Sequence, residues 1–105
     1  MGCSKKIQPI NVSDESWGNG YILEDVWIGK KSGYESWEPH VQAIKNERGN
    51  LALRFCYWKR DENGERAGFV NSAMFVYDET MEDLRDEAKK NNADIILMLF
   101  KKLAE

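Results

Sequence analysis

The side chains with the clearest chemical potential in this chain are basic and flat aromatic residues along its middle. The stretch 49–77 begins with alternating apolar residues, turns at Asn63-Gly64 and returns as a second apolar-rich run, which is typical of a β-hairpin. Arg54 and Trp58 share one face of the first arm, because side chains alternate across a strand. Basic grooves with stacking rings hold single-stranded nucleic acid, and the pattern favours that chemistry.

The candidate nucleic-acid-binding residues are basic side chains on strands or turns, with one tryptophan between them. We expect the basic members to neutralise phosphates and Trp58 to stack on bases; Trp27, Tyr34 and Trp37 are weaker stacking candidates. Trp27 and Trp37 are explained as well by a place in the core, and exposed lysines are common on any protein. The predicted binding residues are Lys30, Lys31, Lys45, Arg48, Arg54, Trp58, Lys59 and Arg66.

Catalytic and metal-binding patterns are not found in the sequence. His40 is the single histidine and follows Pro39, so we interpret it as a strand-edge residue. Acid pairs such as Glu24-Asp25 are interpreted as solvated, and no Cys-x-x-Cys motif or phosphate-binding glycine loop is present. The sequence therefore predicts a protein that is not an enzyme, and it indicates no metal and no cofactor.

Charge is divided unevenly between the middle of the chain and the segment after it. Residues 26–60 hold seven basic and three acidic side chains, whereas residues 61–90 hold four basic and nine acidic ones, and the net charge of the chain is −3. A basic sheet beside an acidic helix can still bind a polyanion on one face, because clustering matters more than the total. Ordinary variation of surface charge explains the division equally well.

The length and composition predict one domain. The chain has 105 residues, of which 42% are hydrophobic, enough for one modest core. Residues 1–20 are polar and are predicted to be a flexible leader, and residues 21–105 are predicted to form a single α+β domain. The cysteines Cys3 and Cys56 do not indicate a disulfide framework.

The chain start carries no recognisable targeting signal. It opens Met-Gly-Cys-Ser-Lys-Lys and lacks the Ser or Thr that the myristoylation pattern requires at the sixth position, so we expect no lipid anchor at Gly2 or Cys3. Neither a signal peptide nor an apolar run of membrane length is present. We expect a cytoplasmic protein, or a nuclear one in a eukaryote.

Hydrophobic periodicity predicts four strands and then a helix that is split at Asn91-Asn92. The second helical segment is apolar almost all round, which indicates burial on two sides and favours a homodimer formed through this helix. On the third strand, the face of Leu53 and Phe55, with Leu51 and Tyr57, is predicted to be the core face. The expected strands are 21–28, 40–46, 51–59 and 69–77, and the expected helical segments are 78–90 and 93–103.

The sequence resembles the transcriptional positive cofactor 4 family of single-stranded DNA binders, which is similar in fold to the plant Whirly proteins. The resemblance covers roughly residues 26–103 and is carried by Ile28-Gly29-Lys30, by Gly49 to Phe55, by Tyr57-Trp58 and by the turn Asp61 to Glu65.

That resemblance implies a curved four-stranded antiparallel sheet followed by a helix, a helix-mediated dimer, and a role in transcription or DNA maintenance. By position, Lys30 would contact phosphate, Tyr57-Trp58 would supply the stacking ring, and Lys45 and Arg48 lie near basic positions of the family. The link 31–40 is longer than in the family, and residues 67–71 depart from its returning strand. A protein-interaction module that uses the sheet or a strand edge is the alternative, and the net negative charge favours it.

Overall fold

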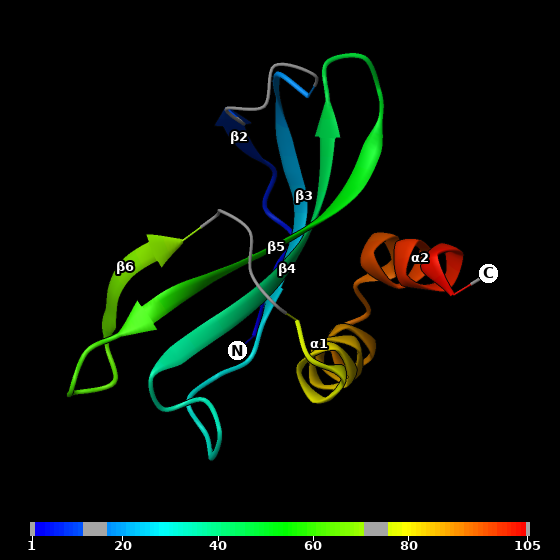
Figure 1. Cartoon of the computed structure of the whole chain (residues 1–105). Coiled ribbons are helices and arrows are strands. Elements are labelled where there is room, and N and C mark those ends of the chain that lie inside the picture. The colour runs from blue at the N-terminus through cyan, green and yellow to red at the C-terminus, as the bar shows by residue number, and fades with distance from the viewer. Residues whose placement is uncertain (1, 12–16, 71–75, 105) are drawn as a thin grey trace.

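One antiparallel β-sheet carries two helices on one of its faces (Figure 1), which confirms the predicted α+β class. The structure is a computed structural model, and it describes residues 2–11, 17–70 and 76–104. These residues form β1 (Cys3–Ser4), β2 (Gln8–Asn11), β3 (Asn19–Trp27), β4 (Trp37–Asn46), β5 (Leu51–Arg60), β6 (Arg66–Val70), α1 (Asp78–Lys90) and α2 (Asp94–Leu103).

The sheet has more strands than the sequence predicted. Its order is β1-β3-β4-β5-β6, and β2 also pairs with β3, so two short strands occupy the part of the chain that was predicted to be a flexible leader. β1 pairs at Cys3 with Val26, and β2 pairs at Gln8 with Ile22. The prediction of a leader is therefore wrong for these strands, because an edge of β3 can bind any backbone and requires no apolar side chains.

Pro39 lies inside β4 rather than at an edge or turn. The carbonyl of Pro39 accepts a hydrogen bond from the Ile28 amide, 3.2 Å away. In an antiparallel ladder the amide of a residue faces the same neighbour as its carbonyl, so the missing donor of Pro39 faces the chain just beyond Trp27, where β3 ends. A proline costs little at such a position, and β4 begins three residues earlier than predicted, at Trp37.

The returning arm of the hairpin is shorter and earlier than predicted. The turn at Asn63-Gly64 is confirmed, with φ of 79° at Gly64, but β6 spans Arg66–Val70 instead of residues 69–77. Residues 71–75 of the predicted strand lie outside the described residues, and Val76 and Tyr77 are not in a strand.

The helices follow the prediction closely. α1 has the predicted bounds, and a break between Asn91 and Ala93 separates it from α2. Asn92 adopts φ of 54° there, a conformation that asparagine tolerates better than most residues. Thr80, whose spacing to Asp83 suggests a capping pair, instead lies buried within the first turn of α1. Among the described residues, no helix is long and apolar enough to cross a membrane.

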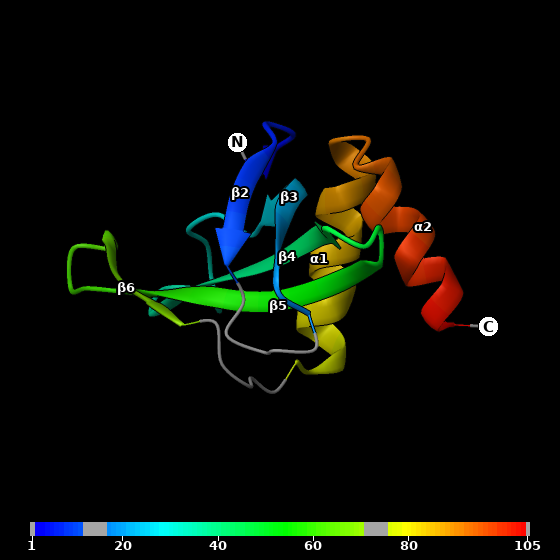
Figure 2. The same cartoon turned by 90° about the horizontal axis from the view of Figure 1, so that it is seen from above.

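Both helices cover the same side of the sheet (Figure 2). Val26 of β3 and Val41 of β4 lie in the core with Leu84 of α1 and Ile96 of α2, and Leu53 and Phe55 of β5 pack against them. This confirms Leu53 and Phe55 as core-facing residues; Leu51 at the end of the same face is largely exposed.

Glu24 is a buried carboxylate at the start of α2, which corrects its interpretation as a solvated acid. The register of β3 and β4 shifts between Ile22 and Glu24, and this shift turns Glu24 toward the helices. Its Oε1 accepts a hydrogen bond of 2.9 Å from the amide of Ile96. The first amides of a helix have no partner within it, so β3 supplies the cap of α2.

The thiol of Cys56 should not react while the protein is folded. Cys56 is 0% exposed on β5, and burial raises the pKa of its thiol to about 12. The thiolate is the reactive form, so we expect an alkylating reagent at mildly alkaline pH to modify Cys56 only when denaturant is added. Half-buried Cys3 is the internal comparison, and modification of native Cys56 as fast as of a free thiol would contradict the structure.

Candidate nucleic-acid interface

The sheet face away from the helices carries a groove of about 420 Å³. β2 and β6 lie on the side of the sheet away from α1 and α2 in both views (Figures 1 and 2). Side chains of alternate residues in β3, β4 and β5 line the groove, because their neighbours in sequence point toward the helices. The lining residues include Asp25, Trp27, His40, Gln42, Arg54, Trp58, Arg66 and Phe69.

Flat groups follow one another along this groove. The guanidinium of Arg66 lies 5.6 Å from the ring centroid of Trp27 and 5.3 Å from that of Trp58. The rings of Trp58 and Phe69 are 5.1 Å apart, and the Arg54 guanidinium lies 5.9 Å from the Phe69 ring. Trp27 in turn stacks on His40, at 5.3 Å and 22°. In order, this planar ladder consists of His40, Trp27, Arg66, Trp58, Phe69 and Arg54.

A β-bulge places Arg66 in the ladder. Trp58 pairs with Phe69 and Lys59 with Gly68, but Arg60 pairs with Arg66, which leaves one extra residue in β6. Strict alternation would put Arg66 and Phe69 on opposite faces of the strand. The bulge instead aims both side chains into the groove, as bulges commonly do near functional sites.

Glu38 on β4 holds Arg66 in place by hydrogen bonds. Its Oε1 accepts hydrogen bonds from Nε and Nη2 of Arg66, at 3.0 and 2.6 Å, and its Oε2 lies 3.3 Å from Nη2 of Arg60. Burial alone would raise the pKa of the Glu38 carboxyl, but the hydrogen bonds and charges of Arg66 and His40 together lower the pKa below its ordinary value of 4.5. Glu38 therefore acts as the ionised anchor of Arg66.

His40 is buried in the central strand β4, so its interpretation as a strand-edge residue is wrong. Its Nδ1 lies 2.8 Å from Oδ1 of Asp25, and its Nε2 lies 2.7 Å from Oε1 of Glu38. Ionised carboxylates only accept hydrogen bonds, so both contacts are hydrogen bonds when both ring nitrogens carry a proton. Asp25 is likewise a partner of His40 and not a solvated acid.

Arg60 fixes the hairpin tip that carries Arg66. Its Nε donates to the carbonyls of Tyr34 and Trp37, at 3.1 and 3.3 Å. Its Nη1 donates to the carbonyl of Gly64 and its Nη2 to that of Ile28, at 3.2 and 3.3 Å. These bonds join the tip to the β3–β4 loop, so this buried guanidinium has a structural role.

Three of the eight predicted binding residues meet in the groove, namely Arg54, Trp58 and Arg66. Arg54 is held by Gln42, whose Oε1 accepts from Nε of Arg54 at 2.8 Å. Sheet register therefore brings Arg66 of β6 to the same groove as Arg54 and Trp58, which both lie on β5.

The two predicted lysines of the β3–β4 loop lie elsewhere. Nζ of Lys30 donates to the carbonyl of Asn63 at 3.3 Å, so Lys30 supports the hairpin tip. Nζ of Lys31 lies 5.7 Å from the ring centroid of Tyr34. Neither residue lines the groove.

The remaining predicted residues also lie outside the groove. Lys45 shares the face of Val41 and Ala43 on β4, which points toward the helices. Lys59 alternates with Trp58 and points away from the groove. Arg48 lies in the turn between β4 and β5.

Sequence reasoning missed Glu38, His40, Gln42 and Phe69 as members of the site. One signal for the first three was present, since polar residues at positions 38, 40 and 42 follow the two-residue period of a strand. No local signal identifies Phe69, because its place in the ladder depends on pairing with Trp58.

His40 and Cys56 are both buried within the sheet at this site. Both ring nitrogens of His40 face carboxylates, and Cys56, its cross-strand neighbour, holds its proton up to a pKa of about 12. Cys56 is therefore held as the unreactive thiol. Within the described parts of the chain, no group of three or more His, Cys, Asp or Glu residues could hold a metal ion.

Comparison with family models, with curated proteins and with solved structures finds no match for this chain. The resemblance to the positive cofactor 4 family therefore stays a prediction.

Proposed function

We propose that this protein binds single-stranded nucleic acid in the groove, without a catalytic activity. The observation that carries the proposal is the planar ladder, in which four rings and two guanidinium groups follow one another at separations between 5.1 and 5.9 Å. Proteins hold unpaired bases on such surfaces, since bases stack on aromatic rings and on arginine planes. Such binding would serve transcription or DNA maintenance.

Two members of the ladder offer surface to a base. Phe69 is 40% exposed, and the side chain of Arg66 is 43% exposed. Trp58 lies between them and is half-buried, so it supports both stacking surfaces. Bases would lie on Phe69 and Arg66, with the guanidinium of Arg54 beside them for a phosphate.

The negative charge of α1 makes the groove side of the sheet more favourable for a polyanion than the helix side. α1 contains six acidic and three basic residues, and this excess equals the chain's net charge of −3. The helix lies across the sheet from β2 and β6 (Figure 2). A nucleic acid is therefore repelled mainly from the helix side.

We expect the affinity for oligo(dT) to depend only weakly on salt. Glu38 already pairs with Arg66, and Asp25 lies near Arg54 in the groove, so few phosphates are neutralised. For about one phosphate, log Kobs should fall with log salt at a slope of about −0.7. A titration of labelled oligo(dT) at several salt concentrations measures this slope, and no binding at low salt would refute the proposed function.

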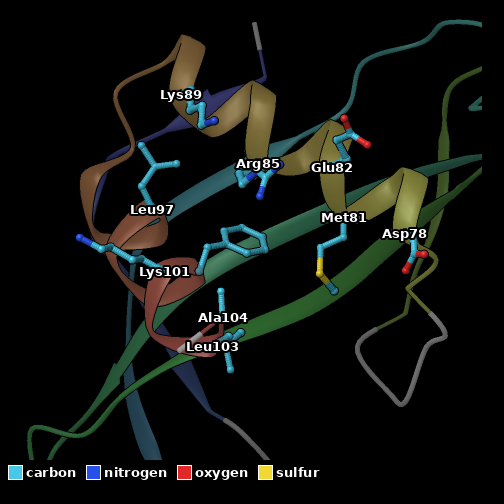
Figure 3. Close-up of a pocket in the computed structure, with 10 residues that line it drawn as sticks. Asp78, Met81, Glu82, Arg85, Lys89, Leu97, Lys101, Leu103 and Ala104 are labelled. Atoms are coloured by element: carbon cyan, nitrogen blue, oxygen red, sulfur yellow. The ribbon is translucent and has the colours of Figure 1, made fainter.

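A second part of the proposal is a homodimer formed through the helices. A hollow of about 740 Å³ lies between α1 and α2 (Figure 3). Its apolar lining includes Met81, Leu97 and Leu103, with Asp78 on α1 and Lys101 on α2 at its border. A two-fold axis would bring the acidic start of α1 in one copy to the basic end of α2 in the other, as a self-complementary interface requires.

Leu103→Asp should convert such a dimer to a monomer. Leu103 is 68% exposed at the hollow, and a buried unpaired carboxylate opposes association. The measurement is molar mass by light scattering. Ile7→Asp, at a similarly exposed apolar residue outside this hollow, is the matched control and should stay dimeric. A wild-type mass of one chain at high concentration would refute the dimer.

A further inference from the structure

Three polar side chains form a row across the floor of the groove. Asp25 on β3 pairs with Gln42 on β4, and Gln42 pairs with Arg54 on β5. All three line the groove. Neighbouring strands are about 5 Å apart, and the row crosses three strands. Its length is therefore about that of a nucleobase together with its hydrogen-bonding partners.

The amide of Gln42 has an unused donor. Nε of Arg54 can only donate, so the oxygen of the Gln42 amide must face it, at 2.8 Å, and this fixes the position of Nε2. The residue is only 4% exposed, and Nε2 has no hydrogen-bond partner among the residues that the structure describes. Among the described residues, Trp17 Nε1 is the only fully buried side-chain donor or acceptor without a partner, so Nε2 of Gln42 is reached from the groove, where it can donate to a ligand acceptor.

Asp25 offers an acceptor beside that donor. Its Oδ1 faces Nδ1 of His40 at 2.8 Å, while its Oδ2 forms no hydrogen bond within the described part of the chain. The side chain of Asp25 is partly exposed in the groove. The floor thus presents a carboxylate acceptor next to an amide donor.

We propose that this row binds the Watson–Crick edge of one guanine base, a proposal that rests on the nucleic-acid binding proposed above. Guanine offers two adjacent donors, N1–H and N2–H, to the Asp25 carboxylate and one acceptor, O6, to Nε2 of Gln42. Adenine, cytosine and uracil or thymine can offer one donor and one acceptor to the same pair. The three bonds to guanine therefore exceed the two available to any other base, and the base would lie beside the planar ladder.

The test compares oligo(dT) strands that differ in one central base. We expect the strand with one deoxyguanosine to bind about tenfold more tightly than the strand with one deoxyadenosine, in the range typical of a bidentate base contact. Deoxyinosine lacks the 2-amino group and keeps one donor and one acceptor, so it should bind like deoxyadenosine. Equal affinities for the three strands would overturn the guanine site while leaving the proposed function intact, and absence of binding to every strand would overturn both.

Asp25→Asn should remove the preference for guanine, because an asparagine side chain has one acceptor oxygen and can accept from only one of the two guanine donors. Asparagine keeps the shape of the side chain and replaces the second acceptor with a donor. A variant that keeps the tenfold preference would exclude Asp25 from recognition, and the base-substituted strands give the answer on the wild-type protein if this variant does not fold. Guanosine monophosphate is the second probe. If its affinity equals that of the guanine strand, the site is assigned to a free nucleotide. If its affinity is much lower, the site is assigned to a base within a strand.

Discussion

Glu38→Gln should lower the free energy of unfolding by about 3–5 kcal/mol, the usual cost of removing one partner from a buried ion pair. Glu38 is buried and contacts Arg60, Arg66 and His40. The amide keeps the volume of the side chain but leaves the buried guanidinium of Arg60 without its counter-charge. Denaturant unfolding of both proteins measures the difference.

The control for this substitution is Glu62→Gln, which changes an exposed acid at the tip of the same hairpin and should alter stability by a few tenths of a kcal/mol at most. Equal stability of Glu38→Gln and wild type would contradict the role of Glu38 as the anchor of the network.

The same carboxylate predicts how stability depends on pH. The folded-state pKa of Glu38 is lower than its ordinary value of 4.5, so the folded state favours the ionised form. Its contribution is complete above the unfolded-state pKa and is lost as the pH falls through the lower, folded-state pKa. Wild type should therefore lose more stability than Glu38→Gln as the solution is acidified below pH 4.5, and parallel pH profiles would count against this linkage.

Trp58→Ala should weaken binding of single-stranded nucleic acid by about 1–3 kcal/mol, which is about 5- to 150-fold in Kd. Its ring lies between Arg66 and Phe69, so its removal leaves both stacking surfaces without support. Affinity for oligo(dT) is measured by fluorescence anisotropy of the labelled strand, after thermal unfolding has shown that the variant is folded.

Tyr21→Ala is the matched control for Trp58→Ala. Tyr21 is an aromatic residue of β3 that is 49% exposed and pairs with Lys45, outside the groove. We expect its affinity to equal that of wild type. A loss as large in Tyr21→Ala as in Trp58→Ala would move the binding surface away from the groove.

The helices, the hairpin turn and the core face of β5 were predictable because each depends on local sequence. The apolar spacing of α1 and the Asn63-Gly64 turn act within a few residues. Alternation along β5 likewise predicts Leu53 and Phe55 for the core and Arg54 and Trp58 for the opposite face.

The composition of the groove was not predictable in the same way, because it depends on strand register. Glu38 and Arg66 are 28 residues apart, and they meet only because a bulge turns Arg66 to the face of Trp58. A shift of one residue reverses the face of every side chain in a strand. The polar composition of residues 1–20 did not predict β1 and β2, because these strands pair with β3 through the backbone.

The contacts of each basic residue and the face of the sheet on which it lies explain why only some of the predicted residues line the groove. The sequence predicted seven lysines and arginines as phosphate contacts. The structure gives Lys30 a partner at the hairpin tip and places Lys45 and Lys59 on the opposite face of the sheet. Of the seven, Arg54 and Arg66 line the groove.

The most direct test of the proposed function is an NMR titration of isotope-labelled protein with oligo(dT). We expect saturable shifts of the indole N–H signals of Trp27 and Trp58 and of the side-chain signals of Arg54 and Arg66, while the methyl signals of Met81 and Leu103 on the helix side stay unchanged. Shifts confined to the helix side, or no shifts at low salt, would contradict it.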